Sequence, residues 1–532
     1  MIDIKTQFIP YQATGYFSKM ITDYITDNPM LQPFYEHTVS KEGIKAAIKQ
    51  RKLFATDRTL LVEIMNNQYQ NIKLTAKQKT YISQLSSNNT FTICTAHQPN
   101  IFTGYLYFIY KILHAVKLAE ELQIELPENN FVPVYYMGSE DADLDELGHI
   151  FIKDQKFEWV TRQTGAVGRM KVDEALIQLM ETINGQLLVY PFGREIIGII
   201  RNCYQLDVTI EQATFKLVNT LFANYGLLIL LPDSAVVKKA FNPVIKKELL
   251  EGFSHEAVKE TVAQFPAEYK VQAGGREINL FYLLDDKRER IEQAGNDFLI
   301  LNTAQKFTKE EMLLELNDHP ERFSPNVILR PVLQEMILPD IAFIGGGGEV
   351  AYWLELRKVF ETVAIPYPML IVRNSFMFVS KELQAIAEKL QFNYTDLFKP
   401  EMELINLLVK RDSALQLTVE KEKQQMFDLY EAIKKLAANV DVTLQTHTDA
   451  LKTQALNKIT ALEKKILSAE KKKFAAQQRQ LQKLKMQLFA NNNLQERVSN
   501  LLPFYAIWGK NFIEIIYNNS KGLQQEFGII LE

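Results

Sequence analysis

The sequence predicts an α/β protein with a Rossmann-like, doubly wound core, a connecting insertion, and a long helical coiled-coil domain. Three observations lead to this expectation. Short apolar segments alternate with amphipathic ones, as in βαβ units. Polar and glycine-rich turns follow several of the apolar segments, where parallel sheets place their sites. Finally, residues 381–490 contain no glycine and one proline, and apolar residues there recur three and four positions apart.

Length and charge exclude two classes of protein. The chain has 532 residues, and at about 100–200 residues per domain this predicts two to four domains. Lys and Arg number 60 and Asp and Glu 64, so a net charge of −4 argues against a globally basic nucleic-acid binder or an acidic-tail protein.

The chain has only two cysteines, Cys94 and Cys203, which favours a reducing, cytoplasmic compartment. We find no signal-peptide pattern and no apolar run suited to a membrane span.

The first part of the predicted core is a βαβ unit. Residues 1–90 read as a helical segment of the core without an obvious site, and 91–150 as the first part of the Rossmann-like core. The elements expected there are a strand at 91–95, a loop at 97–103, a helix at 104–122 and a strand at 131–137. Because such units build parallel sheets, we expect functional residues where these strands end.

Residues 151–320 are expected to hold an insertion together with further core elements. The expected elements are a hairpin over 150–172, helices near 173–184, 206–224 and 235–251, a buried strand at 227–231 and antiparallel strands over 270–302.

Residues 321–380 are expected to form the second part of the core. The expected elements are a third parallel strand at 327–332, a fourth at 341–344, a glycine turn at 345–348, a helix at 349–363 and a fifth strand at 369–372.

Residues 381–492 are predicted to form a helical hairpin or antiparallel coiled coil, with a turn at 439–445, and residues 493–532 return to the core. Between Lys452 and Lys485 ten Lys or Arg residues stand against only two acidic ones, Glu463 and Glu470. We interpret this basic arm as a solvent-exposed helix face or as a surface that pairs with an acidic helix. The alternative is that it contacts nucleic acid.

The first candidate site is the loop after the first strand, which contains His97, Gln98 and Asn100. A histidine there can donate to a phosphate or oxyanion, or exchange protons near neutral pH. The next helix points free amides toward the same place. The alternative is a turn in which His97 only caps that helix.

The second candidate site is the acidic strip that follows the strand at 131–137. It contains Glu140, Asp141 and Asp143 within a run of five carboxylates in seven residues. These carboxylates are suited to capturing an ammonium group or a magnesium ion. The alternative is that they favour a helix N-terminus through its dipole.

The third candidate site is the run Gly345, Gly346 and Gly347, which Gly348 and Glu349 continue. Glycines between a strand and a helix let backbone amides approach an anion, although a tight turn explains them equally. Arg330 and Arg373 lie near the expected ends of strands and are suited to clamping a carboxylate or phosphate, or to structural ion pairs. The chain has no Walker A motif and no Cys/His spacing typical of zinc.

Together these segments resemble the cysteine-adding enzymes of bacillithiol biosynthesis, the cysteine ligases. The similarity lies in TAHQPNIFTGYLYFIYK (95–111), VPVYYMGSEDADLDELGH (132–149), LRPVLQEMILPDIAFIGGGGEVAYW (329–353), PYPMLIVRNS (366–375) and NLQERVSNLLPFY (493–505). Some relatives carry a histidine in the acidic motif where this chain has Ala142.

The resemblance implies a homodimeric ligase whose coiled coil pairs two subunits. The implied reaction joins L-cysteine to glucosaminyl-malate through an amide bond. ATP is implied as a co-substrate by the type of reaction, magnesium is an option, and no tightly bound cofactor, membrane partner or nucleic acid is expected. From the motifs above and this resemblance we assign catalysis to His97 and Gln98. We assign substrate binding to Asn100, Glu140, Asp141, Asp143, Arg330, Gly345, Gly346, Gly347, Glu349 and Arg373, and no residue to a metal.

The rival hypothesis is a coiled-coil scaffold whose Rossmann core binds a metabolite without catalysis. The absence of a Walker A motif and of a metal motif from the sequence permits it.

Overall fold

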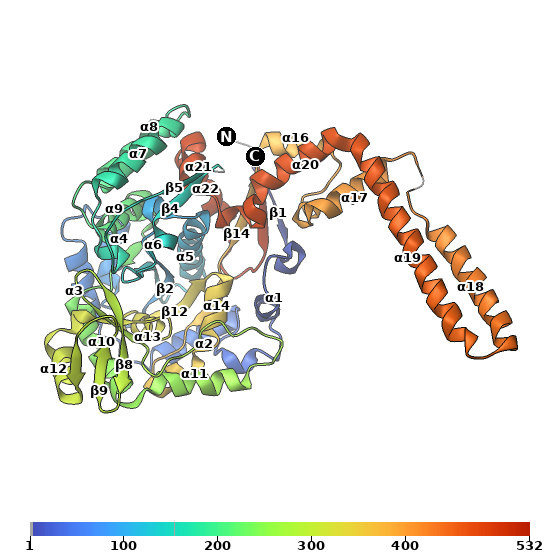
Figure 1. Cartoon of the computed structure of the whole chain (residues 1–532). Helices are drawn as coiled ribbons and strands as arrows, with labels where there is room; N and C mark the ends of the chain where they lie inside the picture. Colours follow the sequence, from blue (N-terminus) through green and yellow to red (C-terminus); the bar gives the residue numbers. More distant parts are fainter. Residues whose placement is uncertain (1–3, 154, 416) are drawn as a thin grey trace. The chain divides into compact units, whose positions relative to one another are not determined.

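The computed structural model describes residues 4–153, 155–415 and 417–532. The chain forms two compact units (Figure 1). The first contains Tyr16–Met377 and Asn493–Ile530, together with the N-terminal strand β1 (Lys5–Ile9). The second contains Phe378–Asn492, with short segments at Ala13–Gly15 and Leu531–Glu532.

A parallel sheet of five strands lies at the centre of the first unit, in the order β13-β12-β2-β3-β6. The strands are β2 (Thr90–His97), β3 (Asn130–Met137), β6 (Leu228–Leu230), β12 (Asp340–Gly345) and β13 (Met369–Val372). Taken in chain order, the sheet runs third, second, first, fourth, fifth. This is the doubly wound order, with its reversal between β2 and β12. The predicted fold class is therefore confirmed.

Strand β2 is the middle of this sheet and is buried along its whole length. Its Cys94 pairs in register with Val134 of β3 on one side and Phe343 of β12 on the other. Its buried threonines are hydrogen-bonded: Thr92 donates to Asp340 at 3.0 Å and Thr95 to the carbonyl of Ile344 at 2.8 Å. The adjoining core gathers apolar side chains of β2 and β12 with those of α2 (Lys41–Arg51) and α5 (Leu106–Glu125).

A second, antiparallel sheet lies within the insertion, in the order β10-β9-β8-β7-β11. The strands are β7 (Leu280–Leu283), β8 (Arg288–Ala294), β9 (Asp297–Ile300), β10 (Lys306–Thr308) and β11 (Phe323–Pro325). The expected antiparallel strands over 270–302 are thus confirmed. So is the hairpin over 150–172, which forms as β4 (His149–Ile152) and β5 (Gln155–Glu158).

The expected strand at 327–332 is wrong. The side chain of Asn326 accepts a hydrogen bond from the backbone N–H of Ile328 at 2.9 Å, which turns the chain. Helix α13 (Arg330–Ile337) begins directly afterwards, with Pro331 in its first turn, where a missing N–H costs nothing. The third strand of the parallel sheet along the chain is instead β6.

The expected helix at 349–363 is two helices, α14 (Gly347–Trp353) and α15 (Arg357–Val363). Between them, the buried carboxylate of Glu355 accepts hydrogen bonds from the backbone N–H groups of Gln272 and Ala273, at 2.6 and 2.9 Å. These hydrogen bonds anchor the segment between the two helices, a break that the apolar pattern alone did not predict.

The first unit contains further helices. They are α1 (Lys19–Ile25), α3 (Arg58–Gln68), α4 (Ala76–Gln84), α6 (Leu144–Leu147), α7 (Glu174–Leu187), α8 (Gly193–Cys203), α9 (Ile210–Phe222), α10 (Ala235–Glu251), α11 (Phe253–Gln264), α12 (Lys309–Asp318), α21 (Leu501–Trp508) and α22 (Lys510–Asn519). The sequence pattern did not predict α8. A further sheet joins β1, β15 (Phe527–Leu531) and β14 (Ser375–Val379), and the boundary between the units falls within β14.

The second unit is helical and is built around a hairpin. Its helices are α16 (Lys381–Lys389), α17 (Glu401–Asp412), α18 (Glu420–Val440), α19 (Leu444–Lys471) and α20 (Ala475–Leu488). Helices α18 and α19 run side by side, as Figure 1 shows, and the turn between them falls inside the predicted 439–445. Exposed ion pairs such as Lys434–Asp449, at 2.6 Å, connect the two helices. Among the described residues, no helix is long and apolar enough to cross a membrane.

Candidate active site

A cavity of about 660 Å³ opens at the carboxyl ends of the parallel strands of the first unit. His97 ends β2, Gly138 follows β3, Pro232 follows β6, Gly346 follows β12 and Arg373 follows β13, and all five line it. In doubly wound sheets, ligands bind at these ends, beside the point where the strand order reverses. The cavity is therefore the candidate active site.

Most of the predicted site residues meet in this cavity, although they come from distant parts of the chain. Those that line it are His97, Gln98, Glu140, Asp141, Arg330, Gly346, Glu349 and Arg373. Those that do not are Asn100, Asp143, Gly345 and Gly347.

His97 is a buried, uncharged imidazole at the end of β2. Its ring lies against those of Tyr107 and Phe108, with centroids 5.4 and 5.1 Å away. Its Nε2 has no hydrogen-bond partner within the described ranges. Burial, followed by the charges of Lys111 and Arg373, holds the pKa of His97 well below its usual value. The capping alternative is wrong, because α5 begins after Tyr105 without a side-chain cap.

Gln98 and Asn100 have different surroundings. Gln98 donates a hydrogen bond to Asp141 at 3.1 Å, and so connects the first candidate loop to the acidic strip. Asn100 is buried outside the cavity, and a Cβ added at Gly104 would lie 2.7 Å from its Cβ. Gly104 has a φ of +60°, so the loop needs a glycine there both for its conformation and for space.

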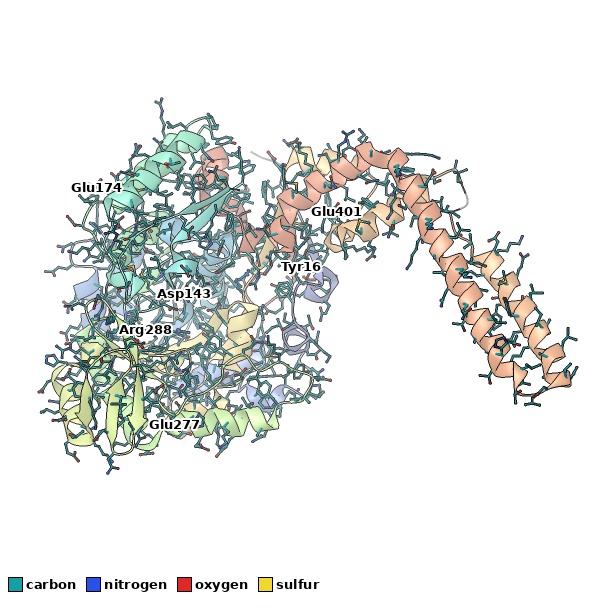
Figure 2. All side chains as sticks on the ribbon, viewed as in Figure 1. Tyr16, Asp143, Glu174, Glu277, Arg288 and Glu401 are labelled. Carbon is teal, nitrogen blue, oxygen red and sulfur yellow. The ribbon has the colours of Figure 1, made fainter. Side chains whose placement is uncertain are left out.

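The acidic strip divides into a buried part and an exposed part. Glu140 lines the cavity and forms an ion pair with Lys238, which also pairs with Asp233 at 3.0 Å. Asp233 is held in turn by Arg169 at 2.7 Å. Asp143, labelled in Figure 2, is exposed and caps α6 by accepting from the N–H of Glu146 at 3.1 Å. For Asp143, the helix-terminus alternative therefore describes the geometry.

The glycine turn is shaped around one carboxylate. Gly346 is the N-cap of α14 and donates its N–H to Glu349 at 2.8 Å. Glu349 also forms an ion pair with Lys111 of α5. A Cβ at Gly346 would lie 3.3 Å from the Glu349 carboxylate, so a side chain there would disturb this contact. Gly347 packs toward Ile21 instead of lining the cavity.

Of the two predicted arginines, Arg373 is buried and Arg330 is partly buried, and they are held differently. Arg373 forms a 2.6 Å ion pair with Glu496, and its backbone N–H donates to Gly345 at 2.8 Å. Its Nε has no hydrogen-bond partner among the described residues. Arg330 lies in the first turn of α13, not at the end of a strand, and donates to the Tyr352 hydroxyl at 2.9 Å. It lines the cavity despite the wrong assignment of its segment.

Sequence reasoning missed four cationic residues of the cavity, namely Lys111, Arg276, Arg288 and Arg497. Lys111 carried a signal, since it is a single charge within a strongly apolar stretch of helix. Arg288, labelled in Figure 2, belongs to the antiparallel sheet and donates to Ser324 at 3.1 Å. With Arg330 and Arg373, six cationic side chains line the cavity, against the four carboxylates of Glu140, Asp141, Glu146 and Glu349. This balance suits a ligand with several anionic groups.

Two other expectations concern metals and thiols. Within the residues that the structure describes, no group of three or more His, Cys, Asp or Glu side chains could hold a metal ion. Cys94 and Cys203 are buried free thiols. Burial raises the pKa of Cys94 well above its usual value, so it is not an activated nucleophile.

Comparisons with known proteins cover both units. A family model described as "Bacillithiol biosynthesis BshC, N-terminal Rossmann-like domain" matches residues 4–374. A second, "Bacillithiol biosynthesis BshC, C-terminal coiled-coil domain", matches residues 376–532. Part of the latter, 493–530, belongs to the first compact unit of the structure.

Three relatives carry the name "Putative cysteine ligase BshC". Those of Flavobacterium johnsoniae and Flavobacterium psychrophilum are 38% and 37% identical, and each match covers 99% of both chains. That of Cytophaga hutchinsonii is 36% identical over 96% of both. A solved chain titled as a "putative arginyl t-RNA synthetase" from Campylobacter jejuni aligns with 9% identity and a TM-score of 0.24, too low to carry an argument.

Proposed function

This chain belongs to the BshC family of bacillithiol biosynthesis, and from that membership we propose that it is a ligase that joins L-cysteine to glucosaminyl-malate through an amide bond. The observation that carries the proposal is the cavity at the switch point. It joins a neutral histidine, a carboxylate strip and six cationic side chains in one space of about 660 Å³. Amide formation needs these kinds of group, because an amine must attack an activated carboxyl and an oxyanion must be stabilised.

His97 and Gln98 are the groups proposed to contact the reacting carboxyl or its phosphate. The free Nε2 of the neutral imidazole is available to a ligand in the cavity. Gln98 lies beside it in sequence and is fixed by Asp141. A neutral imidazole is suited to hydrogen bonding with an oxyanion or to accepting a proton from an amine.

The acidic strip is proposed to bind the amine. Glu140 is already paired with Lys238, so Asp141 and Glu146 are the cavity carboxylates better suited to an incoming ammonium group. Burial, followed by Asp143 and Asp141, raises the pKa of Glu146. A carboxylate with a raised pKa is a better acceptor for the proton that the amine must lose.

The cationic side chains of the cavity are proposed to bind malate or phosphate. Arg330 and Arg373 present guanidinium groups to this cavity. A guanidinium binds carboxylates and phosphates through paired hydrogen bonds. The Nε of Arg373 is a buried donor without a partner among the described residues, which suits a ligand in this position.

ATP is proposed as the co-substrate, with magnesium as its counter-ion. When bound, ATP would supply the energy and the leaving group for activating the cysteine carboxyl. The cationic side chains of the cavity fit a polyphosphate chain. Since the described residues offer no preformed metal cluster, magnesium would enter with the nucleotide.

We also propose that the hairpin α18–α19 pairs two subunits. No residue of α18 is buried, and Leu429, Ile433 and Leu436, which recur four and three positions apart, are 55%, 41% and 68% exposed. An apolar stripe of this kind on a helix is typical of a coiled-coil seam that lacks its partner.

The direct test is bacillithiol formation by the purified protein. The wild-type chain is incubated with L-cysteine, glucosaminyl-malate, ATP and magnesium, and the product is measured by mass spectrometry. We expect His97→Asn to lower turnover by about 100- to 10,000-fold, the range of a lost general acid or base. Unchanged turnover in this variant would remove the catalytic role of His97.

A cellular test separates the ligase from the scaffold hypothesis. Cells that lack the gene should lose bacillithiol and accumulate glucosaminyl-malate, and the His97→Asn gene should not restore the thiol. Normal bacillithiol levels in the deleted cells would favour a scaffold.

A further inference from the structure

We propose that Lys111 and Glu349 are positioning residues, whose ion pair connects the end of β2 to the glycine turn before α14 and thereby sets His97 in its working orientation. This inference rests on the proposed ligase function for its kinetic readout only. Neither residue touches a reacting group in this proposal, and each acts through a neighbour.

Lys111 is fully buried in α5, with 1% of its surface exposed. Its ammonium group donates to the carbonyl of Ala96 at 2.8 Å and pairs with Glu349. Ala96 immediately precedes His97 in β2. Burying an ammonium group is unfavourable unless it is paired and hydrogen-bonded, so both partners of Lys111 are needed to keep it there.

Glu349 contacts the glycine turn that follows β12, on the other side of the point where the strand order reverses. Its carboxylate accepts from the N–H of Gly346 and receives the ammonium group of Lys111. A single oxygen, Oε2, makes both contacts. The ends of β2 and β12 are thus connected through one chain of contacts, from Ala96 through Lys111 and Glu349 to Gly346.

The backbone of His97 is fixed from the side of β3. Its carbonyl accepts from the hydroxyl of Tyr135 at 3.0 Å and from the N–H of Gly138 at 2.8 Å. Lys111 fixes the preceding carbonyl. With two consecutive carbonyls held, the imidazole has a defined direction toward the cavity, where its Nε2 is unpartnered within the described residues.

The pair also shapes the charge around His97. The charged and titratable side chains facing it are Lys111 and Tyr107 from α5 and Arg373 after β13, and Glu349 of α14 offsets Lys111. Removing the Lys111 charge should therefore make protonation of His97 easier, whereas removing the Glu349 charge should not. A purely structural pair would not predict opposite responses.

The test compares Lys111→Met, which keeps the length of the side chain, with Glu349→Gln, which can still accept from Gly346 but has no charge. Lys117→Met is the matched control, because Lys117 lies on the same helix and outside the cavity. The titration of His97 is followed by NMR of the chain with ¹³C-labelled histidines. There are seven, and His97→Asn identifies the resonance.

We expect Lys111→Met to raise the pKa of His97, and Glu349→Gln and Lys117→Met not to raise it. In the bacillithiol assay, Lys111→Met should lower kcat by about 100-fold, the effect of a misplacement of about 1 Å, with KM changing much less. Lys117→Met should leave kcat unchanged. An unaltered His97 titration together with unaltered kcat in Lys111→Met would overturn the proposal.

The double variant Lys111→Met/Glu349→Gln covers the case in which Lys111→Met does not fold. It leaves no unpaired buried charge, so it should recover stability. A stable double variant with low kcat supports positioning, whereas restored kcat contradicts it. If the wild-type chain forms no bacillithiol, the ligase proposal fails, and the NMR titration still decides whether Lys111 controls His97.

Discussion

One ion pair beside the cavity and one in the hairpin have the same length but different consequences. Arg373–Glu496 beside the cavity and Lys434–Asp449 in the hairpin both measure 2.6 Å. The side chains of the first pair are 3% and 0% exposed, and those of the second 29% and 41%. Water and ions screen the exposed pair, whereas the buried pair is shielded from them and is surrounded by protein groups such as the Ser375 hydroxyl. The first unit thus uses charge to fix a site, and the hairpin presents charge and apolar side chains to its surroundings.

The largest expected effect concerns the hairpin. A variant lacking residues 402–490 should be a monomer by light scattering if the exposed faces of α18 and α19 pair two subunits. The intact chain is the control and should have twice the mass expected for one chain. A dimer that persists in the shortened chain would contradict the proposed pairing.

The second prediction concerns the buried pair. Glu496→Gln leaves the Arg373 guanidinium buried without a charged partner, so we expect a loss of about 3–5 kcal/mol in the free energy of unfolding. The measurement is urea unfolding of the first unit. The double variant Arg373→Met/Glu496→Gln should recover part of that loss, because no unpaired charge remains. An equal loss in both variants would indicate that packing, not charge, is responsible.

The third prediction concerns pH. Burial raises the pKa of Glu211 to about 7 from the usual 4.5, next to Asp233 and Glu140. A carboxyl with a raised folded-state pKa stabilises the fold below its unfolded pKa, and this contribution is lost as the pH rises through 7. Glu211→Gln should therefore gain stability relative to the wild type between pH 4.5 and pH 7, by up to about 3 kcal/mol. Chemical unfolding at several pH values measures this difference, and a constant difference would contradict the raised pKa.

The smallest expected effect is at the exposed pair. Lys434→Met should leave the midpoint of unfolding of the second unit unchanged within error, since exposed pairs of this kind often contribute nothing measurable. It is the matched counterpart of Glu496→Gln. A large loss of stability in Lys434→Met would show that exposed and buried ion pairs contribute alike.

Much of the site could be predicted because the ends of the parallel strands can be recognised in the sequence. His97 ends β2, and Gly346 and Arg373 directly follow β12 and β13. Parallel sheets bring such strand ends together. Lys111, Arg288 and Arg497 could not be placed in this way. They lie within a helix, in the inserted antiparallel sheet and in the C-terminal segment, and only the packed structure brings them to the cavity.

The wrong prediction of a strand at 327–332 has a local cause. Its apolar residues resemble a strand, but the side-chain hydrogen bonds of Asn326 and the position of Pro331 start a helix. Apolar pattern alone does not distinguish the two over so few residues.

The late return of the chain to the first unit has a consequence for its biosynthesis. Glu496 lies 123 residues after Arg373 and follows the whole helical hairpin. At about 5–20 residues per second, a ribosome needs roughly 6–25 s to make that interval. During this time the nascent core carries Arg373 without its carboxylate, so the active site is completed only when the segment after the hairpin has emerged.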